Sequence, residues 1–117
     1  LHVPRFYLYE DTVHAQYKCY VYVKSEALKS GWTRDRILNE INQAGVPCFQ
    51  GSCSEVYLEK AFDGTGWRPK GRLQNAKRLG ETSLCFLVHP TLTGDDIENT
   101  CKVIRNVMMQ AERNDAR

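Results

Sequence analysis

The sequence predicts a small α+β domain of two layers, in which helices pack on a sheet of about three or four strands. Three observations lead to this prediction. A tyrosine-rich segment alternates like a strand, several segments have apolar residues at helical spacing, and a continuous apolar run of strand length lies between two of those helical segments. The chain has 117 residues, of which 42% are hydrophobic and 26% are charged, and this size and composition suit one folded domain.

The first predicted element is a strand over residues 15–23, AQYKCYVYV, which is rich in aromatic and β-branched residues. Alternation along a strand gives each face every second residue. One face should therefore point inward and the other outward. The inward set is Tyr17, Cys19, Val21 and Val23, and the outward set is Lys18, Tyr20 and Tyr22.

Residues 34–45 predict an amphipathic helix with a signal at each end. Thr33 precedes it as an N-cap, Asp35 lies in its first turn and Gly45 follows its last turn. The apolar residues 46–49, VPCF, then predict a short strand. The inward positions of the helix are Ile37, Leu38, Ile41 and Ala44.

A shorter helix of about two turns is predicted for residues 54–62, SEVYLEKAF. Ser54 stands at its start and Glu55 lies early in the first turn. Residues 63–72 hold three glycines and a proline, so they predict a loop, and loops of this length are often functional or exposed. The side chains expected to face inward from the short helix are Val56, Tyr57, Leu58 and Ala61.

The last third of the chain predicts a helix, a strand and a long helix. Residues 74–83 predict the first helix, and LCFLVHP, residues 84–90, predicts a strand buried on both faces and stopped by Pro90. Thr93 and Asp96 then have the spacing of a capping box. An apolar stripe along the long helix should face the sheet: Ile97, Cys101, Ile104, Val107, Met108 and Ala111.

Charge and hydropathy exclude several classes of partner. The net charge is only +2, so no overall field attracts nucleic acid or anionic lipid. No apolar run approaches the roughly 18 residues of a membrane span, and the first residues lack a secretory signal. We therefore expect a cytoplasmic protein that binds neither nucleic acid nor a membrane.

The chain begins at Leu1 rather than at a methionine, so we expect it to be part of something longer. Residues 1–14 contain no clear start of a helix or strand, and we interpret them as the remnant of a connection between domains. Residues 15–113 should form the folded domain, and residues 114–117 should be a frayed tail.

The chain holds five cysteines, an odd number, and most of them lie inside apolar patterns, which indicates reduced thiols rather than a disulfide framework. Cys48 and Cys53 are spaced more widely than typical paired zinc ligands, and the other candidate ligands are scattered singly. Cys53 also lacks a basic neighbour upstream that would activate a thiol. We expect no metal site and no catalytic thiol, with Cys48 in the core and Cys53 in a loop.

The segment QGSC, residues 50–53, remains as a candidate ligand loop. Gln50 and Ser52 supply hydrogen-bonding groups, and Gly51 allows close approach of the backbone. No Ser-His-Asp arrangement, phosphate-binding glycine motif or RNA-binding sheet face is supported. The histidines are isolated, the glycine-rich loop follows no strand, and the tyrosine-rich strand has no second aromatic strand to match it.

Three segments taken in order resemble a known family. They are YKCYVYV, TRDRILNEINQAGVPC and LQNAKRLGETSLCFLVHPTLTGDDIENTCKVI. The last is the most specific, because an apolar strand ending in His89-Pro90 is followed by a threonine-bounded turn and an acidic helix start. With these elements the chain resembles the C-terminal small domain of pyridoxal-phosphate-dependent sugar aminotransferases of the DegT/DnrJ/StrS type, within the fold type I aminotransferases.

The resemblance implies a dimeric enzyme that uses pyridoxal 5'-phosphate to aminate nucleotide-linked keto sugars for surface polysaccharides. It implies that a large N-terminal domain of the same polypeptide holds the cofactor and the Schiff-base lysine. This chain would then carry no catalytic residue, bind no cofactor and be inactive alone. Family members commonly carry a His-Tyr or His-Phe pair in the substrate loop, and FQGSCSE stands there instead.

The position of that loop implies a substrate-binding edge. Its expected residues are Phe49, Gln50, Gly51, Ser52, Cys53 and Lys18, with Glu55 and Tyr57 behind them. These residues would orient the sugar or its diphosphate, which accelerates a reaction by positioning rather than by proton transfer. A free-standing α+β ligand-binding or regulatory module without catalysis stays as the alternative interpretation.

Overall fold

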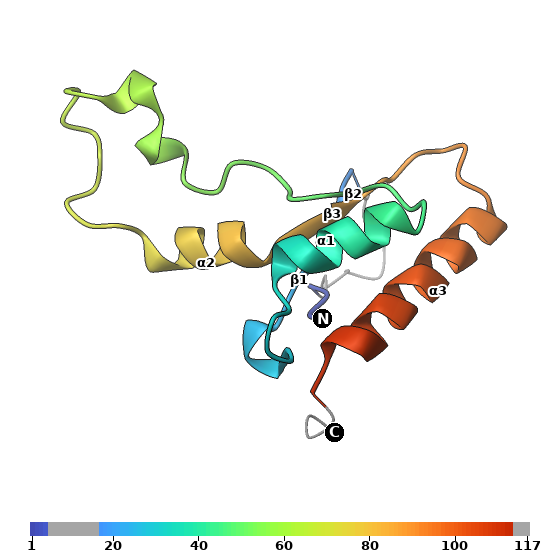
Figure 1. The fold of residues 1–117 in the computed structure, drawn as a ribbon. Coiled ribbons are helices and arrows are strands. Elements are labelled where there is room, and N and C mark those ends of the chain that lie inside the picture. Colours follow the sequence, from blue (N-terminus) through green and yellow to red (C-terminus); the bar gives the residue numbers. More distant parts are fainter. Residues whose placement is uncertain (5–16, 114–117) are drawn as a thin grey trace, which may run out of the picture.

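The computed structural model describes residues 1–4 and 17–113, which form a three-stranded sheet with helices packed on it (Figure 1). The predicted α+β class is confirmed. The start of the predicted first strand and the predicted tail lie outside the described residues. The elements are β1 (Cys19–Tyr22), η1 (Ser25–Ala27), α1 (Arg34–Gln43), β2 (Cys48–Phe49), η2 (Val56–Leu58), η3 (Lys60–Phe62), α2 (Gln74–Thr82), β3 (Ser83–Phe86) and α3 (Gly94–Ala111).

Strand β3 lies at the centre of the sheet and pairs antiparallel with β1 on one side and β2 on the other. Cys19 of β1 and Cys48 of β2 both lie opposite Phe86 of β3. Because side chains alternate along each strand, these three residues share one face of the sheet. The opposite face carries the next paired position of each strand: Tyr20, Phe49 and Cys85.

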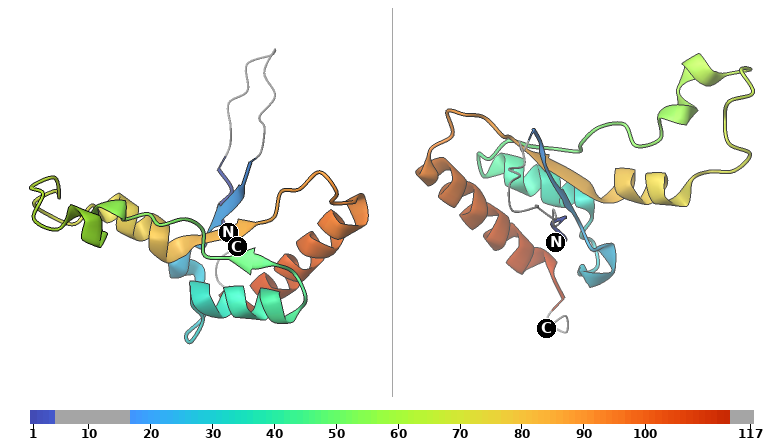
Figure 2. Two further views of the ribbon diagram at one scale, coloured as in Figure 1. Left: turned by 90° about the horizontal axis from the view of Figure 1, so that it is seen from above. Right: turned by 180° about the vertical axis from the view of Figure 1, so that it is seen from behind.

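The hydrophobic core lies on the first of these faces, where α1 packs on β2, β3 and α3 (Figures 1 and 2). Ile37 and Ile41 of α1 are fully buried, and so is Leu84 of β3. Full burial of a side chain of this size stabilises the fold by about 1.5–3 kcal/mol relative to leaving it exposed. The other buried apolar residues are Val21, Val23, Leu28, Val46, Cys48, Phe86, Val107, Met108 and Ala111.

Helix α1 agrees closely with the sequence prediction. The Thr33 hydroxyl accepts a hydrogen bond from the Arg36 backbone N–H at 3.1 Å, which satisfies a donor of the first turn. The chain then leaves the helix through Gly45 at a φ of +85°, a conformation that favours glycine. Ala44 is exposed, contrary to prediction, because the helix ends before it.

Helix α3 opens with the predicted capping box, in which Thr93 and Asp96 each bond the other's backbone. The predicted stripe is only partly correct. Its last three members are buried, but Ile97 and Cys101 are exposed. An apolar hollow of about 580 Å³ lies between the first turns of α3 and the ends of the strands, so these turns do not pack on the sheet. Among the described helices, none has the length and apolar character needed to cross a bilayer.

Two predicted strands are too long. Tyr17 was expected to point inward, but it precedes β1 and is 83% exposed. Leu87 and Val88 were expected inside a strand buried on both faces, yet β3 ends before them and both are exposed. The register gives the reason, because β1 begins and β3 ends at the pair Cys19 and Phe86, and among residues 1–4 and 17–113 neither strand has a partner beyond it.

The predicted helix over residues 54–62 is wrong. The chain forms the two short 3-10 turns η2 and η3 instead, and Glu59 between them is extended, with φ −62° and ψ 147°. Of the four side chains expected to face inward, only Tyr57 is half-buried. No layer of the domain lies over this segment to receive an apolar helix face. The exposed members are Val56, Leu58 and Ala61.

Arg68 organises this segment through polar contacts rather than through burial in a core. Its guanidinium donates to the backbone carbonyls of Tyr57 at 2.9 Å, Leu58 at 2.9 Å and Glu59 at 3.0 Å. In an α-helix these carbonyls would accept bonds from N–H groups four residues later. Arg68 therefore supplies hydrogen-bond donors to carbonyls that lack the partners of an α-helix.

Residues 53–73, which we call the arm, run outward from the sheet and return to α2 (Figures 1 and 2). The loop predicted for residues 63–72 is confirmed as the outer part of the arm. Trp67 near its tip is 78% exposed. The arm and α2 together form a projection beyond the packed core.

Candidate functional site

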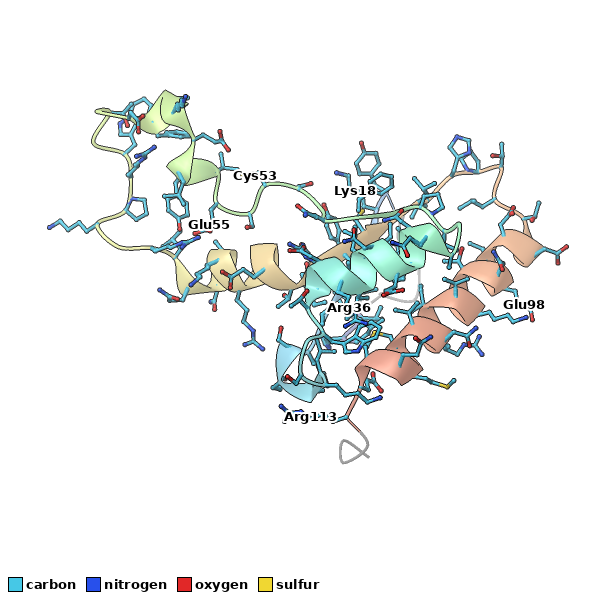
Figure 3. All side chains as sticks on the ribbon, viewed as in Figure 1. Lys18, Arg36, Cys53, Glu55, Glu98 and Arg113 are labelled. Atoms are coloured by element: carbon cyan, nitrogen blue, oxygen red, sulfur yellow. The ribbon has the colours of Figure 1, made fainter. Side chains whose placement is uncertain are left out.

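The candidate substrate loop, residues 50–53, follows β2 and crosses the outer face of the sheet. Tyr20 lies on this face because it pairs with Cys85, two positions along β1 from Lys18. Lys18 stands just before β1, at the edge of the sheet that the loop crosses (Figure 3). The loop can therefore meet both side chains without entering the core.

Ser52 is the centre of the contacts between the loop and β1. The Tyr20 hydroxyl accepts the Ser52 backbone N–H at 3.1 Å and shares a hydrogen bond of 2.7 Å with the Ser52 hydroxyl. The Lys18 ammonium also donates to the Ser52 hydroxyl, at 3.2 Å. Two predicted site residues, Lys18 and Ser52, are thus brought into direct contact.

A second contact fixes the loop to the central strand. The Ser83 hydroxyl donates to the Gln50 carbonyl at 2.5 Å. Ser83 is buried, so its hydroxyl requires a partner, and the loop backbone supplies it. The backbone of the candidate loop is therefore tied to both β1 and β3.

Gly51 is required by the close approach of the loop to the sheet. Its φ is +95°, and a Cβ at this position would lie 2.7 Å from the Tyr20 ring and 3.1 Å from the Ser83 hydroxyl. Both the backbone conformation and the available space exclude a larger side chain. The sequence assigned Gly51 to a close approach of the loop backbone to a ligand, which stays a prediction, whereas the close neighbours in the structure are Tyr20 and Ser83 of the sheet.

The remaining candidate side chains face solvent on the two sides of the loop. Phe49 is 53% exposed and, with Lys18 and Tyr20, lines a hollow of about 370 Å³. Gln50 and Cys53 line a second hollow of about 330 Å³ between the loop and α2. Because both hollows are open, a ligand could contact the loop from either side.

Tyr20 is the site residue that sequence reasoning missed. It was predicted on the same outward face as Lys18, but it was not assigned to the substrate-binding edge. Alternation alone could have placed Tyr20 beside Lys18 in the site. What alternation could not show is that the loop after β2 returns over this face.

Glu55 and Tyr57, expected behind the substrate edge, instead bond residues at the base of the arm, where Figure 3 labels Glu55. Arg72 donates two hydrogen bonds to the Glu55 carboxylate, at 2.7 and 2.6 Å. The Tyr57 hydroxyl donates to Glu55 at 2.7 Å and accepts the Leu73 backbone N–H at 2.9 Å. No pattern in the sequence indicated Arg72, because the two ends of the arm are far apart in the chain.

These contacts determine the charge state of the pair. The hydrogen bonds from Arg72, and next the one from Tyr57, lower the pKa of the Glu55 carboxyl to about 2. Burial, and then the Glu55 carboxylate, raises the pKa of the Tyr57 hydroxyl. Near neutral pH Glu55 is ionised and its oxygens are engaged within the protein. We therefore assign Glu55 and Tyr57 to the structure of the arm rather than to ligand contact.

The thiols and acidic groups do not assemble into a metal centre within residues 1–4 and 17–113. All five cysteines are free. Cys48 is buried as predicted, and burial raises the pKa of its thiol to about 11, so the reactive thiolate is disfavoured. Cys53 is exposed in the loop as predicted, and its thiol donates to the Glu59 carboxylate at 3.5 Å.

Pyridoxal 5'-phosphate requires a lysine that can form a Schiff base within an enclosed site. All the lysines of the chain are in the described part, and none is buried. Lys18, which is the lysine nearest to the loop contacts, is exposed and bound to Ser52. The described residues do not fit this cofactor by themselves, and we derive no step of its chemistry from them.

Comparison with known proteins gives a further test of the fold. No model of a protein family matches the chain, and no curated protein matches it. The solved structure of the aminotransferase from Psychrobacter cryohalolentis is similar, with a TM-score of 0.79 and 64% sequence identity over 83% of this chain. The aminotransferase TlmJ from Streptoalloteichus hindustanus has a similar fold, with a TM-score of 0.62 and 21% identity over 79% of this chain.

The matched region is only a part of each of these enzymes. It covers 25% of the Psychrobacter protein and 22% of the Streptoalloteichus protein, so the chain spans about a quarter of their length. Both similarities agree with the antiparallel sheet and helices described above. This chain has an aminotransferase-like fold.

Proposed function

We propose that this chain is the C-terminal small domain of a pyridoxal-phosphate-dependent aminotransferase of the DegT/DnrJ/StrS type. Its substrates would be nucleotide-linked keto sugars in the formation of amino sugars for surface polysaccharides. The observation that carries the proposal is the candidate loop, residues 50–53, which the sheet holds through Tyr20 and Ser83. It lies in a chain of which 83% matches an aminotransferase at 64% sequence identity. The three segments that resemble sugar aminotransferases support the narrower assignment to the DegT/DnrJ/StrS type.

In this proposal the loop orients the sugar nucleotide. Phe49 offers an exposed ring, and Gln50 and Ser52 offer polar groups beside it. Lys18 adds a positive charge at the same edge, suited to a diphosphate. Since Tyr20 and Ser83 fix the loop backbone, the ligand does not have to order it, and such preorganisation favours binding.

The remaining parts of the enzyme would lie elsewhere in a longer polypeptide. A large N-terminal domain would hold the cofactor, which supplies an electron sink for transamination when bound. Two features support this division: the chain spans about a quarter of its structural neighbours, and none of its lysines is buried. The enzyme would act as a homodimer in the cytoplasm.

The test uses the full-length protein purified with pyridoxal 5'-phosphate, with sugar-nucleotide affinity measured by calorimetry. We expect Gln50→Ala and Ser52→Ala to weaken binding about tenfold each and to leave cofactor absorbance unchanged, since each removes a hydrogen-bonding group from the ligand edge. Ser30→Ala is the matched control, because Ser30 is exposed in the turn before α1. Unchanged affinity in both loop variants would contradict the assignment.

The gene upstream of Leu1 separates this proposal from a free-standing ligand-binding module. A small domain of a type I aminotransferase requires roughly 250 preceding residues that include a Schiff-base lysine. A start codon immediately before Leu1 would leave no room for that domain and would overturn the proposal.

A further inference from the structure

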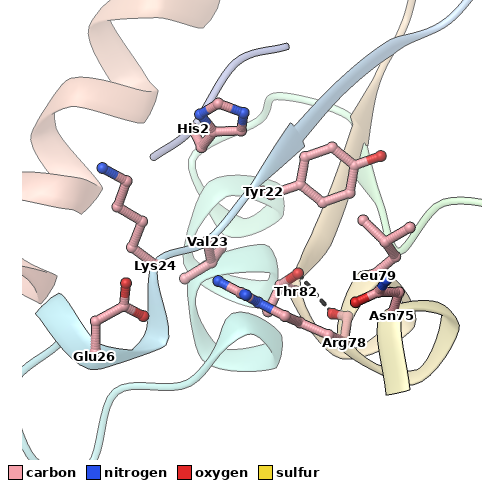
Figure 4. Close-up of a pocket in the computed structure, with 9 residues that line it drawn as sticks. All are labelled: His2, Tyr22, Val23, Lys24, Glu26, Asn75, Arg78, Leu79 and Thr82. Atoms are coloured by element: carbon pink, nitrogen blue, oxygen red, sulfur yellow. Dashed lines mark hydrogen bonds between the residues drawn. The ribbon is translucent and has the colours of Figure 1, made fainter. Parts of the chain in front are cut away.

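A further cavity, separate from the hollows described above, lies on the far side of α2 from the candidate loop. Its volume is about 570 Å³, and β1, η1 and α2 line it (Figure 4). Helix α2 separates the two regions. Lys77 and Gly80 of this helix face the loop, whereas Asn75, Arg78 and Leu79 face the cavity, as expected for positions three and four residues apart.

Basic side chains gather in this cavity. Lys24, His2 and Arg78 line it, and Glu26 is the acidic residue beside them. Figure 4 shows the Arg78 side chain reaching from α2 toward the segment of Val23 and Lys24. Lys24 and Arg78 outnumber Glu26, so the cavity carries a net positive charge.

The basic groups of the cavity differ from other basic side chains of the fold. On the same helix Lys77 lies 3.7 Å from Glu81, and in the arm Arg72 lies 2.6 Å from Glu55. Within the residues that the structure describes, neither Lys24 nor Arg78 forms an ion pair or a side-chain hydrogen bond. Their donors are available to a ligand.

The walls of the cavity are fixed by backbone contacts. His2 and Tyr22 exchange two backbone hydrogen bonds of 2.8 Å, and Val23 donates to the Thr82 carbonyl at 2.9 Å. The Thr82 hydroxyl donates to the Arg78 carbonyl at 2.7 Å, the dashed line of Figure 4. These bonds connect both chain segments that carry the basic groups, so the cavity is formed before any ligand binds.

We propose that this cavity binds a small phosphorylated molecule, at a site separate from the candidate substrate loop. Arginine binds phosphate through two parallel hydrogen bonds and lysine adds a point charge, which suits Arg78 and Lys24. Asn75 offers amide groups to the ligand. The half-exposed Leu79 provides an apolar surface for a ring, and the volume is typical of small-molecule sites.

Calorimetry on the full chain tests the site, with glucose 1-phosphate as the probe and glucose as the unphosphorylated comparison. We expect binding of the phosphate ester and none of glucose. Arg78→Gln should weaken binding about tenfold, because it removes the bidentate charge-assisted contact. Glu26→Gln should strengthen it about twofold, because it removes a repulsive charge.

Two control variants make the result specific. Lys77→Gln removes a charge from the other face of α2, so it should bind glucose 1-phosphate like the unaltered chain, whereas Ser52→Ala tests whether the ester binds at the candidate loop instead. The proposal is overturned if the phosphate ester does not bind, if Arg78→Gln binds equally well, or if Lys77→Gln loses as much affinity as Arg78→Gln. Binding lost only in Ser52→Ala would move the ligand to the loop and also overturn it. Circular dichroism verifies that each variant is folded.

Discussion

The packed core and the arm are stabilised by different interactions. In the core, Ile41 and Leu84 are fully buried between α1 and the sheet. In the arm, apolar side chains such as Trp67 are exposed, and Arg68 and Arg72 provide the order through bonds to carbonyls and a carboxylate. Hydrophobic periodicity describes the first region well and fails in the second, because it contains no information on polar contacts between distant residues.

The largest expected effect is in the core. Ile41→Ala should lower the free energy of unfolding by about 2–5 kcal/mol, since it removes buried methyl groups and leaves a cavity. Asn39→Ala, at an exposed position of the same helix, should change it by less than about 0.5 kcal/mol. Urea denaturation followed by circular dichroism measures both. Similar losses in the two variants would mean that α1 does not pack through Ile41.

A pair of glycine substitutions compares the braced loop with the arm directly. Gly51→Ala should destabilise the protein by about 2–3 kcal/mol, because a left-handed backbone and a clash with Tyr20 act together. Gly64→Ala, at a φ of +71° with nothing near its Cβ position, should cost only about 1 kcal/mol. Thermal unfolding measures the difference. Equal effects would show that the loop does not lie against Tyr20 in solution.

Removal of the Arg68 guanidinium should affect the arm and leave the core stable. Arg68→Ala frees three backbone carbonyls, so we expect faster trypsin cleavage after Lys60. The unfolding free energy of the core should fall by no more than about 1 kcal/mol. Lys70→Ala, in the same exposed loop, is the control. Cleavage at the rate of the unaltered chain would argue that Arg68 does not order the arm.

The smallest expected effect is on the pH dependence of the arm. The pKa of Glu55 falls from its ordinary value of 4.5 to about 2 in the folded chain. The stabilisation of the arm by the ionised Glu55 carboxylate is therefore fully present above pH 4.5 and is lost as the pH falls toward 2. The protection factor of the Leu73 amide, which is its intrinsic exchange rate at each pH divided by the rate measured by mass spectrometry, should fall across this interval. Glu55→Gln should remove this pH dependence. Protection that is constant down to pH 2 would contradict the pKa direction.

The sequence predicted the ends of α1 and the start of α3 better than the strand lengths. Thr33 and Gly45 bound α1, and the capping box of Thr93 and Asp96 begins α3, because capping is local and is readable from neighbouring residues. The ends of β1 and β3 depend on their partners. Leu87 and Val88 have strand-like composition, yet no neighbouring strand extends far enough to pair with them.

The sequence predicted which residues form the candidate site but not the contacts between them. Residues 50–53 and Lys18 were identified from the sequence, and their exposure is compatible with ligand contact. Tyr20 as their central partner required the loop to return over the sheet. The pairing of Glu55 with Arg72 likewise required the two ends of the arm to lie side by side.

By itself, the sequence determined the α+β class, the capped helices and the outer loop of the arm. These features depend on interactions among residues close in the chain or on a repeating pattern of side chains. Only the tertiary structure decided where the strands end, that the arm forms 3-10 turns rather than an α-helix, and that Lys18, Tyr20 and Ser52 meet. The physical reason is that each of these depends on contacts between segments distant in the sequence, which local patterns do not encode.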